Sequence, residues 1–290
     1  MAASDNLRAA GLMTLGMAGF ALSDACMKLV SALLPLDQAI ALRGVLTVAA
    51  LGALAAWQGS WRARLPRRDW ARIGLRTLAE VAAAWLFLAA LFRMPLANVS
   101  AILQALPLTV SLGAALFLAE SMGWRRLTAI AVGFVGVLMI VQPGTDGFTV
   151  WSLLAVGSVL TVAVRDLATR RMSAAVPSGL VALCAACGVT GSALLVGLRG
   201  GWVDPPPVAW GALAVSAAAV VTGYLMVIGA MRWGEVSSVA PFRYTGLIWS
   251  LLLGLTLFGS WPDRLTLAGS AVVIASGLYT LWRETRRRRE

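Results

Sequence analysis

The chain has 290 residues, of which 59% are hydrophobic and 13% charged, with a formal net charge of +11 and no histidine. A water-soluble protein of this length needs a largely polar exterior, so this composition excludes an ordinary soluble domain. The lack of histidine also excludes a histidine proton relay, a Ser–His hydrolase and the H-E-x-x-H motif of metalloproteases.

Ten apolar stretches, separated by short loops that carry arginine, occupy most of the chain. Each is about 20 residues long, which is the length of an α-helix that crosses the hydrocarbon core of a bilayer. We predict spans at 8–33, 37–58, 71–92, 97–119, 127–142, 150–170, 178–198, 208–231, 236–258 and 265–284. The predicted fold is therefore all-α, a polytopic integral membrane protein.

The basic residues of the loops are distributed unevenly. With the N-terminus inside, 16 of them fall on the cytoplasmic side and 3 on the other side. The positive-inside rule then predicts that both termini are cytoplasmic, in a multi-pass protein of a bacterial-type inner membrane. We expect the tail Arg286–Arg289 to contact anionic lipid. No continuous basic face with interleaved aromatic residues is evident, so a nucleic-acid partner is not expected.

The two halves of the chain resemble each other. At an offset of 142 residues Asp24 matches Asp166, and Lys28 falls on Arg170; at an offset of 139, Trp85 meets Tyr224. Each half holds five spans, an odd number, so the halves must have opposite orientations. We predict a first repeat at 1–143 and a second at 144–290. Inverted repeats are typical of secondary transporters, whose substrate site lies near the midplane between the repeats.

These features resemble the ten-helix EamA-type members of the drug/metabolite transporter superfamily. The likeness rests on two five-helix halves and on three motifs, Leu42–Arg43–Gly44, Pro95–Ser100 and Gly234–Ser238. The resemblance implies export of metabolites, with aromatic amino acid exporters as the first comparison. It also implies that the third, fourth, eighth and ninth spans line a central cavity.

Charged residues within the spans are few, and such residues usually face a partner or an aqueous cavity. Asp24–Lys28 and Asp166–Arg170 have the i,i+4 spacing of an ion pair on one helix face. We interpret them as structural locks or as gates, with three further arginines as alternative partners. Asp24 would alternate between Lys28 and Arg43, and Asp166 would pair with Arg165 or Arg76.

Glu80 is the remaining carboxylate within a span. Counting about 1.5 Å per residue places it at the same depth as Arg243 of the ninth span. We predict that Glu80 and Arg243 meet beside the cavity, as a structural salt bridge or as contacts for the ammonium and carboxylate groups of an amino acid. Arg76, four residues before Glu80, is the alternative partner, unless it extends to the lipid headgroups. Proton coupling would have to use Glu80, Asp24 or Asp166, and facilitated transport is the simpler interpretation.

Aromatic and polar side chains deep in the spans complete the predicted substrate-binding set. Stacking on aromatic rings suits a flat or hydrophobic solute, although buried rings also serve packing alone. The candidates for substrate contact are Glu80, Trp85, Gln104, Tyr224, Arg243, Tyr244 and Trp249. Pro107 and Pro241 are predicted to interrupt the fourth and ninth spans and to let them bend.

The sequence therefore predicts a secondary transporter that works by alternating access between the two repeats, with one chain forming the pathway. Hydrophobic or aromatic amino acids are the first substrate choice, organic anions or other metabolites the second, and a lipophilic-cation exporter the third. An intramembrane enzyme is a more distant alternative, since the metal-binding and catalytic motifs of such enzymes are lacking. No cofactor and no metal site is expected.

Overall fold

A computed structural model describes residues 2–59, 65–118, 123–144, 148–173, 175–233 and 239–287. It is all-helical within these ranges and contains ten helical stretches long and apolar enough to span a membrane. The tail Arg286–Arg289, for which lipid contact is predicted, lies outside the described side chains. Its helices are α1 (Ala2–Val30), α2 (Leu36–Trp57), α3 (Arg67–Arg93), α4 (Leu96–Leu103), α5 (Leu106–Phe117), α6 (Trp124–Val141), α7 (Val150–Arg170), α8 (Ser178–Gly197), α9 (Pro207–Trp233), the 3-10 helix η2 (Ala240–Tyr244), α11 (Thr245–Phe258) and α12 (Arg264–Arg287).

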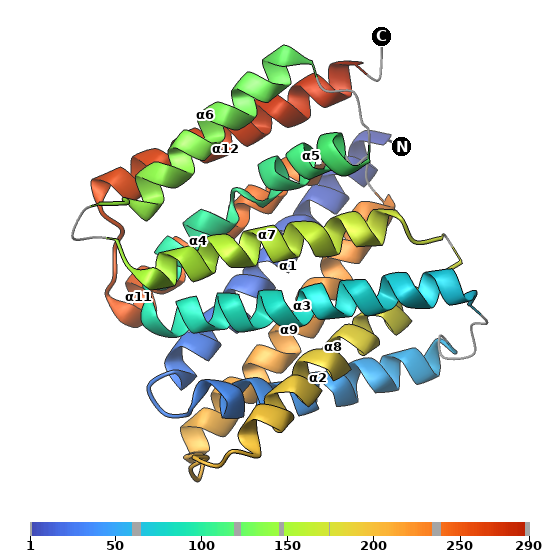
Figure 1. The fold of residues 1–290 in the computed structure, drawn as a ribbon, viewed down its shortest axis with the longest axis vertical. Coiled ribbons are helices and arrows are strands. Elements are labelled where there is room, and N and C mark those ends of the chain that lie inside the picture. The colour runs from blue at the N-terminus through green and yellow to red at the C-terminus, as the bar shows by residue number, and fades with distance from the viewer. Residues whose placement is uncertain are drawn as a thin grey trace.

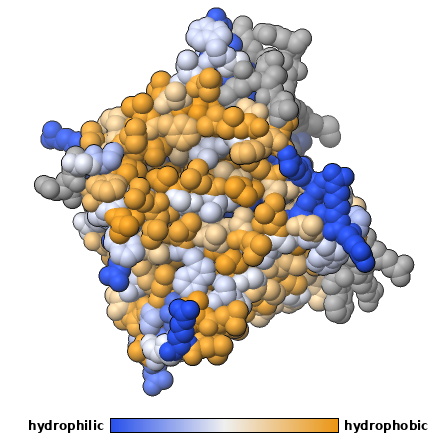
Figure 2. Space-filling model, viewed as in Figure 1, coloured by the Kyte–Doolittle hydropathy of each residue, from blue (hydrophilic) through white to orange (hydrophobic). Residues whose placement is uncertain are grey.

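The helices run back and forth through one bundle, and both ends of the chain lie at the same end of it (Figure 1). Helices from opposite halves of the sequence lie side by side: α3 packs on α7, α2 on α8, and α6 on α12. Long apolar side chains are exposed on the outside, among them Leu195 and Leu138. The face shown in Figure 2 is mainly hydrophobic, which suits contact with lipid.

Two of the ten spans are interrupted. The fourth consists of α4 and α5, which break at Gln104–Ala105, one turn before Pro107 in the chain. The ninth begins as the 3-10 helix that contains Pro241 and continues as α11. Proline removes one backbone donor and strains the turn before it, which accounts for the break between α4 and α5. A role of these breaks in bending during transport stays a prediction.

Glycine permits the closest approach of α6 to α12. A Cβ on Gly269 would lie 2.6 Å from the backbone oxygen of Gly136, and one on Gly136 would lie 2.8 Å from that of Gly269. Ser276 of α12 also donates a hydrogen bond to the carbonyl of Ala129 on α6. Small residues bring backbones together in this way where no hydrophobic effect between helices operates.

The loop before α12 is tied to the end of α6. Asp263 accepts a hydrogen bond from the backbone N–H of Thr266 at 3.0 Å and one from the side-chain amide of Gln142 at 2.5 Å. Hydrogen bonds from Thr266 and Gln142 hold the pKa of Asp263 below its usual range, because they favour the charged carboxylate. Asp263 therefore both caps α12 and links it to α6.

We predict that Gly269→Val lowers the free energy of unfolding by about 1–3 kcal/mol, because the added methyl groups force α12 away from the backbone of α6. Denaturation of the purified protein in detergent micelles measures this change. The matched control is Gly211→Val on α9, where a Cβ would meet no atom within 4 Å. Equal stability of the two variants would contradict the assigned packing.

Candidate functional site

A cavity of about 110 Å³ lies between α2, α3, α8 and α9. Each helix contributes one face, with lining residues spaced three to four apart, as expected for an α-helix turned toward a common centre. The lining comprises Arg43, Gly44, Thr47 and Leu51 of α2, Arg76, Glu80 and Ala84 of α3, Ala182, Ala185, Ala186, Val189 and Thr190 of α8, and Val220 and Tyr224 of α9. Such a volume holds a few water molecules.

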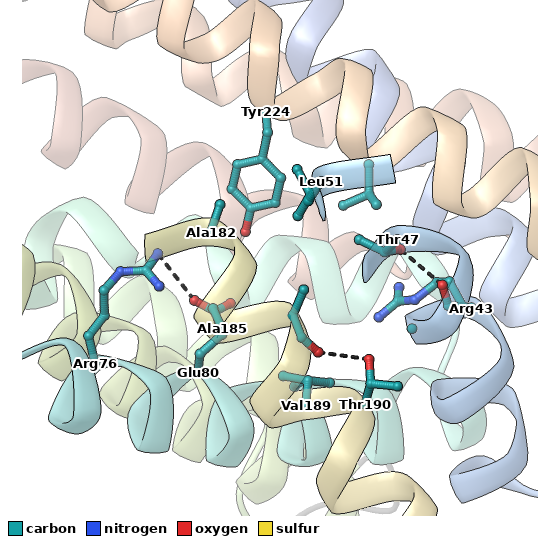
Figure 3. Close-up of a pocket in the computed structure, with 14 residues that line it drawn as sticks. Arg43, Thr47, Leu51, Arg76, Glu80, Ala182, Ala185, Val189, Thr190 and Tyr224 are labelled. Atoms are coloured by element: carbon teal, nitrogen blue, oxygen red, sulfur yellow. Dashed lines mark hydrogen bonds and ion pairs between the residues drawn. The ribbon is translucent and has the colours of Figure 1, made fainter. Parts of the chain in front are cut away.

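The cavity lies near the middle of the bundle. Glu80 is 13 residues from either end of α3, which corresponds to about 20 Å on each side. Val220 is likewise 13 residues from either end of α9. The walls are largely small and apolar, but Arg43 and Arg76 approach from opposite sides, and the hydroxyl of Tyr224 points inward (Figure 3). A polar cavity at this depth is the usual position of a transporter's substrate site.

Glu80 is held between two guanidinium groups. Arg165 of α7 donates from Nη1 to both carboxylate oxygens of Glu80, at 3.2 and 3.3 Å. Nη2 of Arg76 lies 3.5 Å from Oε2 of Glu80. Arg165 also contacts Asp166 at 2.9 Å, so two arginines and two carboxylates form a cluster without net charge. Mutual neutralisation makes these charges tolerable within the membrane.

The cluster joins α3 to α7. Nε of Arg76 donates to the hydroxyl of Thr169 at 3.1 Å, and that hydroxyl donates to the carbonyl of Arg165 at 2.8 Å. Nη1 of Arg76 is buried and has no hydrogen-bond partner in the described part of the chain. The side of α3 that carries Glu80 and Arg76 thus serves the helix contact and the cavity wall together.

Several predicted ion pairs are wrong. Glu80 pairs with Arg76 and Arg165 rather than with Arg243, because α7 packs directly along α3 whereas η2 contacts α1, α11 and α12. The ammonium of Lys28 donates to the carbonyl of Phe92 at 3.2 Å, in the last turn of α3. That carbonyl belongs to the negative end of the helix dipole, so it competes with Asp24 for the ammonium.

On the second predicted i,i+4 pair, the carboxylate of Asp166 is bound by its neighbour Arg165. This is one of the two alternative partners considered from the sequence. Arg170, the predicted i,i+4 partner, lies in the last turn of α7 and is exposed. Within the cluster, the contacts of Asp166 with Arg165 and of Glu80 with Arg76 were among the pairings considered from the sequence, whereas the contact of Glu80 with Arg165 was not.

Among the predicted aromatic contacts, Tyr224 lines the cavity, where its ring packs edge-on against Phe20 at 5.2 Å between centroids. Trp85 is instead turned toward α8 and donates to the hydroxyl of Ser192 at 2.9 Å. The hydroxyl of Tyr244 lies against Gly277 of α12. Trp249 is half-buried on α11, none of whose described residues lines the cavity.

Gln104 is also away from the cavity lining. It is buried at the break between α4 and α5, where its amide donates to the carbonyl of Ser100 at 3.3 Å.

The cavity is lined by the second, third, seventh and eighth spans, whereas the family resemblance implied the third, fourth, eighth and ninth. Thr47, Thr190 and the alanines of α8 were not identified from the sequence as lining residues, because small residues on an apolar helix do not by themselves indicate a site.

A family model described as "EamA-like transporter family" matches residues 7–142. A riboflavin transporter of Vibrio cholerae is 29% identical over 221 residues, which is 74% of this chain and 73% of the relative. An S-adenosylmethionine uptake transporter of Rickettsia bellii is 23% identical over 191 residues, 66% of this chain and 65% of the relative. One solved structure superposes over the full length of both chains with a TM-score of 0.67 and 20% identity, a likeness that shows the fold.

A ten-helix membrane protein with a charged cavity at its midplane belongs to the class of membrane transporters. With the match to the EamA-like transporter family over residues 7–142 and the relatives named as transporters, the protein is a membrane transporter whose first half is similar to that family. The bacterial relatives and the ten apolar helices make it a multi-pass protein of the bacterial inner membrane. The alternative of an intramembrane enzyme is set aside, because the family and these relatives are transporters.

We predict that Glu80→Gln lowers the free energy of unfolding by about 3 kcal/mol, because it leaves buried guanidinium charge without its carboxylate. Chemical denaturation in detergent measures the loss. The matched variants are Arg165→Gln and the double substitution, whose cost is expected to be smaller than the sum of the two single costs. Strictly additive costs would show that Glu80 and Arg165 do not interact.

Proposed function

We propose that the protein transports a small heterocyclic metabolite of the riboflavin or S-adenosylmethionine class through the cavity between α2, α3, α8 and α9. The observation that carries the proposal is the midplane cavity itself, which joins charged and aromatic groups from both halves of the chain. Relatives named for riboflavin and for S-adenosylmethionine uptake support this class of substrate and favour import. The aromatic ring of Tyr224 suits a flat heterocycle.

Amino acid export, the first choice from the sequence, becomes the second candidate. A zwitterion would find both signs of charge in the cavity, since Glu80 and Arg43 line it. None of the relatives cited above is named for amino acid transport, however, and three of the aromatic residues on which that prediction rested lie elsewhere. Organic anions are a related candidate, because two of the three charged side chains in this lining are arginines.

The proposed mechanism is alternating access between two inverted repeats, 1–143 and 144–290. Contacts between the halves support it, because they occur in matched sets. α1, the first helix of one half, packs on α9 and α11, and α7, the first helix of the other, packs on α3 and on α4 and α5. α2 packs on α8 and α9, while α8 packs on α2 and α3. Two repeats related by a twofold axis would produce this pattern.

The cavity is too small for either metabolite as it stands, so the proposal requires the helices around it to move apart and then close again. The α3–α7 ion pairs and the close contact of α2 with α8 are the contacts that such a movement would have to change. Rigid-body rocking of one repeat against the other would change them without unfolding either helix.

We predict that wild-type protein in proteoliposomes takes up riboflavin or S-adenosylmethionine with saturable kinetics. Ala186→Trp is expected to reduce the rate of uptake by about tenfold or more, because the indole fills the cavity. The matched control is Leu195→Trp on the same helix, whose side chain is 68% exposed on the outer surface and is expected to leave uptake unchanged.

Labelled phenylalanine and tryptophan are measured in the same liposomes. Saturable transport of amino acids alone would replace the proposed substrate class by the second candidate. Equal uptake by the Ala186→Trp and Leu195→Trp variants would show that the pathway does not pass through this cavity.

A further inference from the structure

Arg43 differs from the other charged residues of the cavity in having no bonded partner. Its side chain extends from α2 toward the centre of the cavity (Figure 3). Arg76 and Glu80, on the opposite side, bond to each other. Within the described residues the guanidinium of Arg43 makes neither an ion pair nor a hydrogen bond. A cation at this depth of a membrane protein usually has a partner, so its lack points to one that is supplied from outside the chain.

Asp24 of α1 is an acidic neighbour of Arg43 that the structure identifies. The two interact electrostatically, yet they are farther apart than an ion pair. Asp24 therefore offsets part of the cost of burying the arginine while leaving all its N–H groups unbonded. A guanidinium in this position has its directional hydrogen bonds available for a ligand.

The threonine hydroxyls of the cavity are already engaged. Thr47 donates to the carbonyl of Arg43 at 2.9 Å, and Thr190 donates to the carbonyl of Ala186 at 2.7 Å. Each satisfies a backbone oxygen of its own helix, as Ser and Thr commonly do in membrane helices.

Among the described lining residues, the donors without a partner are the guanidinium of Arg43, Nη1 of Arg76 and the hydroxyl of Tyr224. Arg76 is held through its other two nitrogens by Glu80 and Thr169, whereas no nitrogen of the Arg43 guanidinium is bonded to a described residue.

A guanidinium presents two parallel N–H groups in a fixed plane, which matches a planar group with two adjacent acceptor atoms. A carboxylate is one such group, and the neighbouring ring nitrogen and carbonyl oxygen of a flavin are another. Lysine, with a single rotating ammonium, would not select for such a pair of acceptors. Arg43 is therefore suited to distinguish solutes that carry two adjacent acceptor atoms in one plane from solutes that lack them.

We propose that Arg43 determines substrate specificity by donating two parallel hydrogen bonds to a planar substrate group with two adjacent acceptor atoms. The proposal rests on the proposed function, because it assumes that the substrate enters this cavity. It assigns to Arg43 a role in recognition, in place of the gate with Asp24 and Lys28 that the sequence suggested.

The test measures ligand-dependent shifts in the thermal unfolding of the full-length protein in detergent, for wild type, Arg43→Gln and Arg43→Lys. Three matched pairs serve as probes: riboflavin and 2-thioriboflavin, S-adenosylmethionine and its decarboxylated form, and phenylalanine and phenethylamine. Benzoate, a small molecule whose carboxylate supplies the two adjacent acceptor atoms, is measured in the same assay. Arg93→Gln is the control, since Arg93 is exposed and lies over the ring of Trp151, 5.4 Å from its centroid, outside the cavity lining.

For the pair that wild type binds, we expect the complete acceptor group to strengthen binding by about 10- to 100-fold, the usual value of hydrogen bonds to a charged group. In Arg43→Gln the two members of the pair are expected to bind equally. Arg43→Lys keeps the charge, and so maintains folding, but is expected to recover only part of the discrimination. Arg93→Gln is expected to behave as wild type.

The outcomes separate the two proposals. If wild type binds benzoate, Arg43→Gln does not, and none of the three pairs is bound, the proposed substrates are wrong while the role of Arg43 stands. If Arg43→Gln weakens the binding of both members of a pair by the same factor, or still binds the complete member more tightly as wild type does, Arg43 is a structural counter-ion of Asp24 and the inference fails. A wild-type protein that binds neither the pairs nor benzoate overturns it as well.

Discussion

The structure depends on the neutralisation of charge at the centre of a membrane-spanning bundle. Glu80 lies at the midpoint of α3, where an isolated carboxylate would be strongly disfavoured. Arg165 and Arg76 bond to it, and Asp166 neutralises the remaining charge. These bonds require α7 to lie against α3, and this contact forms one side of the assembly around the cavity.

Two helix crossings that join the halves, α1 with α9 and α7 with α3, are held together in different ways. At the crossing of α1 and α9, small residues bring the backbones together: a Cβ on Gly19 would lie 2.9 Å from the carbonyl oxygen of Ala219, and Ser23 and Ser216 share a hydrogen bond of 2.8 Å. At the crossing of α7 and α3, which corresponds to it in the predicted repeat, ion pairs also link the helices. Charged side chains can exchange ion-pair partners while their helices keep their conformation, whereas closely packed helix backbones cannot shift without losing their contacts. The α3–α7 contact is thus the better suited of the two to change during a transport cycle.

Much of the fold follows from the sequence, because length and lack of charge define a membrane span almost by themselves. The predicted spans agree with the structure within a few residues for α2, α7 and α8. The α4–α5 break and the 3-10 turn at Pro241 are interruptions at two prolines that the sequence already marked. Span ends were less accurate for α1 and α3, where polar residues extend the helix beyond the apolar core.

The site was less predictable, since its composition depends on which helices are neighbours. Counting residues along each helix placed Glu80 at the same depth as Arg243. Such a count does not show which way each helix is turned about its axis or which helix lies next to it. Tyr224 and Trp85 occupy equivalent positions in the predicted repeat, yet Tyr224 faces the cavity and Trp85 bonds to Ser192. Arg43 was predicted as an alternative partner of Asp24, beside Lys28, and only the structure shows that its guanidinium bonds to neither Asp24 nor any other described residue.

Protection of a cysteine placed in the cavity tests the central claim, that the substrate occupies this space, most directly. The native cysteines Cys26, Cys184 and Cys187 are free and can be replaced by serine before Ala186→Cys is introduced. The account predicts that riboflavin or S-adenosylmethionine slows alkylation of this cysteine, with half-maximal protection at the concentration that half-saturates transport. Saturable transport with an unchanged rate of alkylation would contradict it.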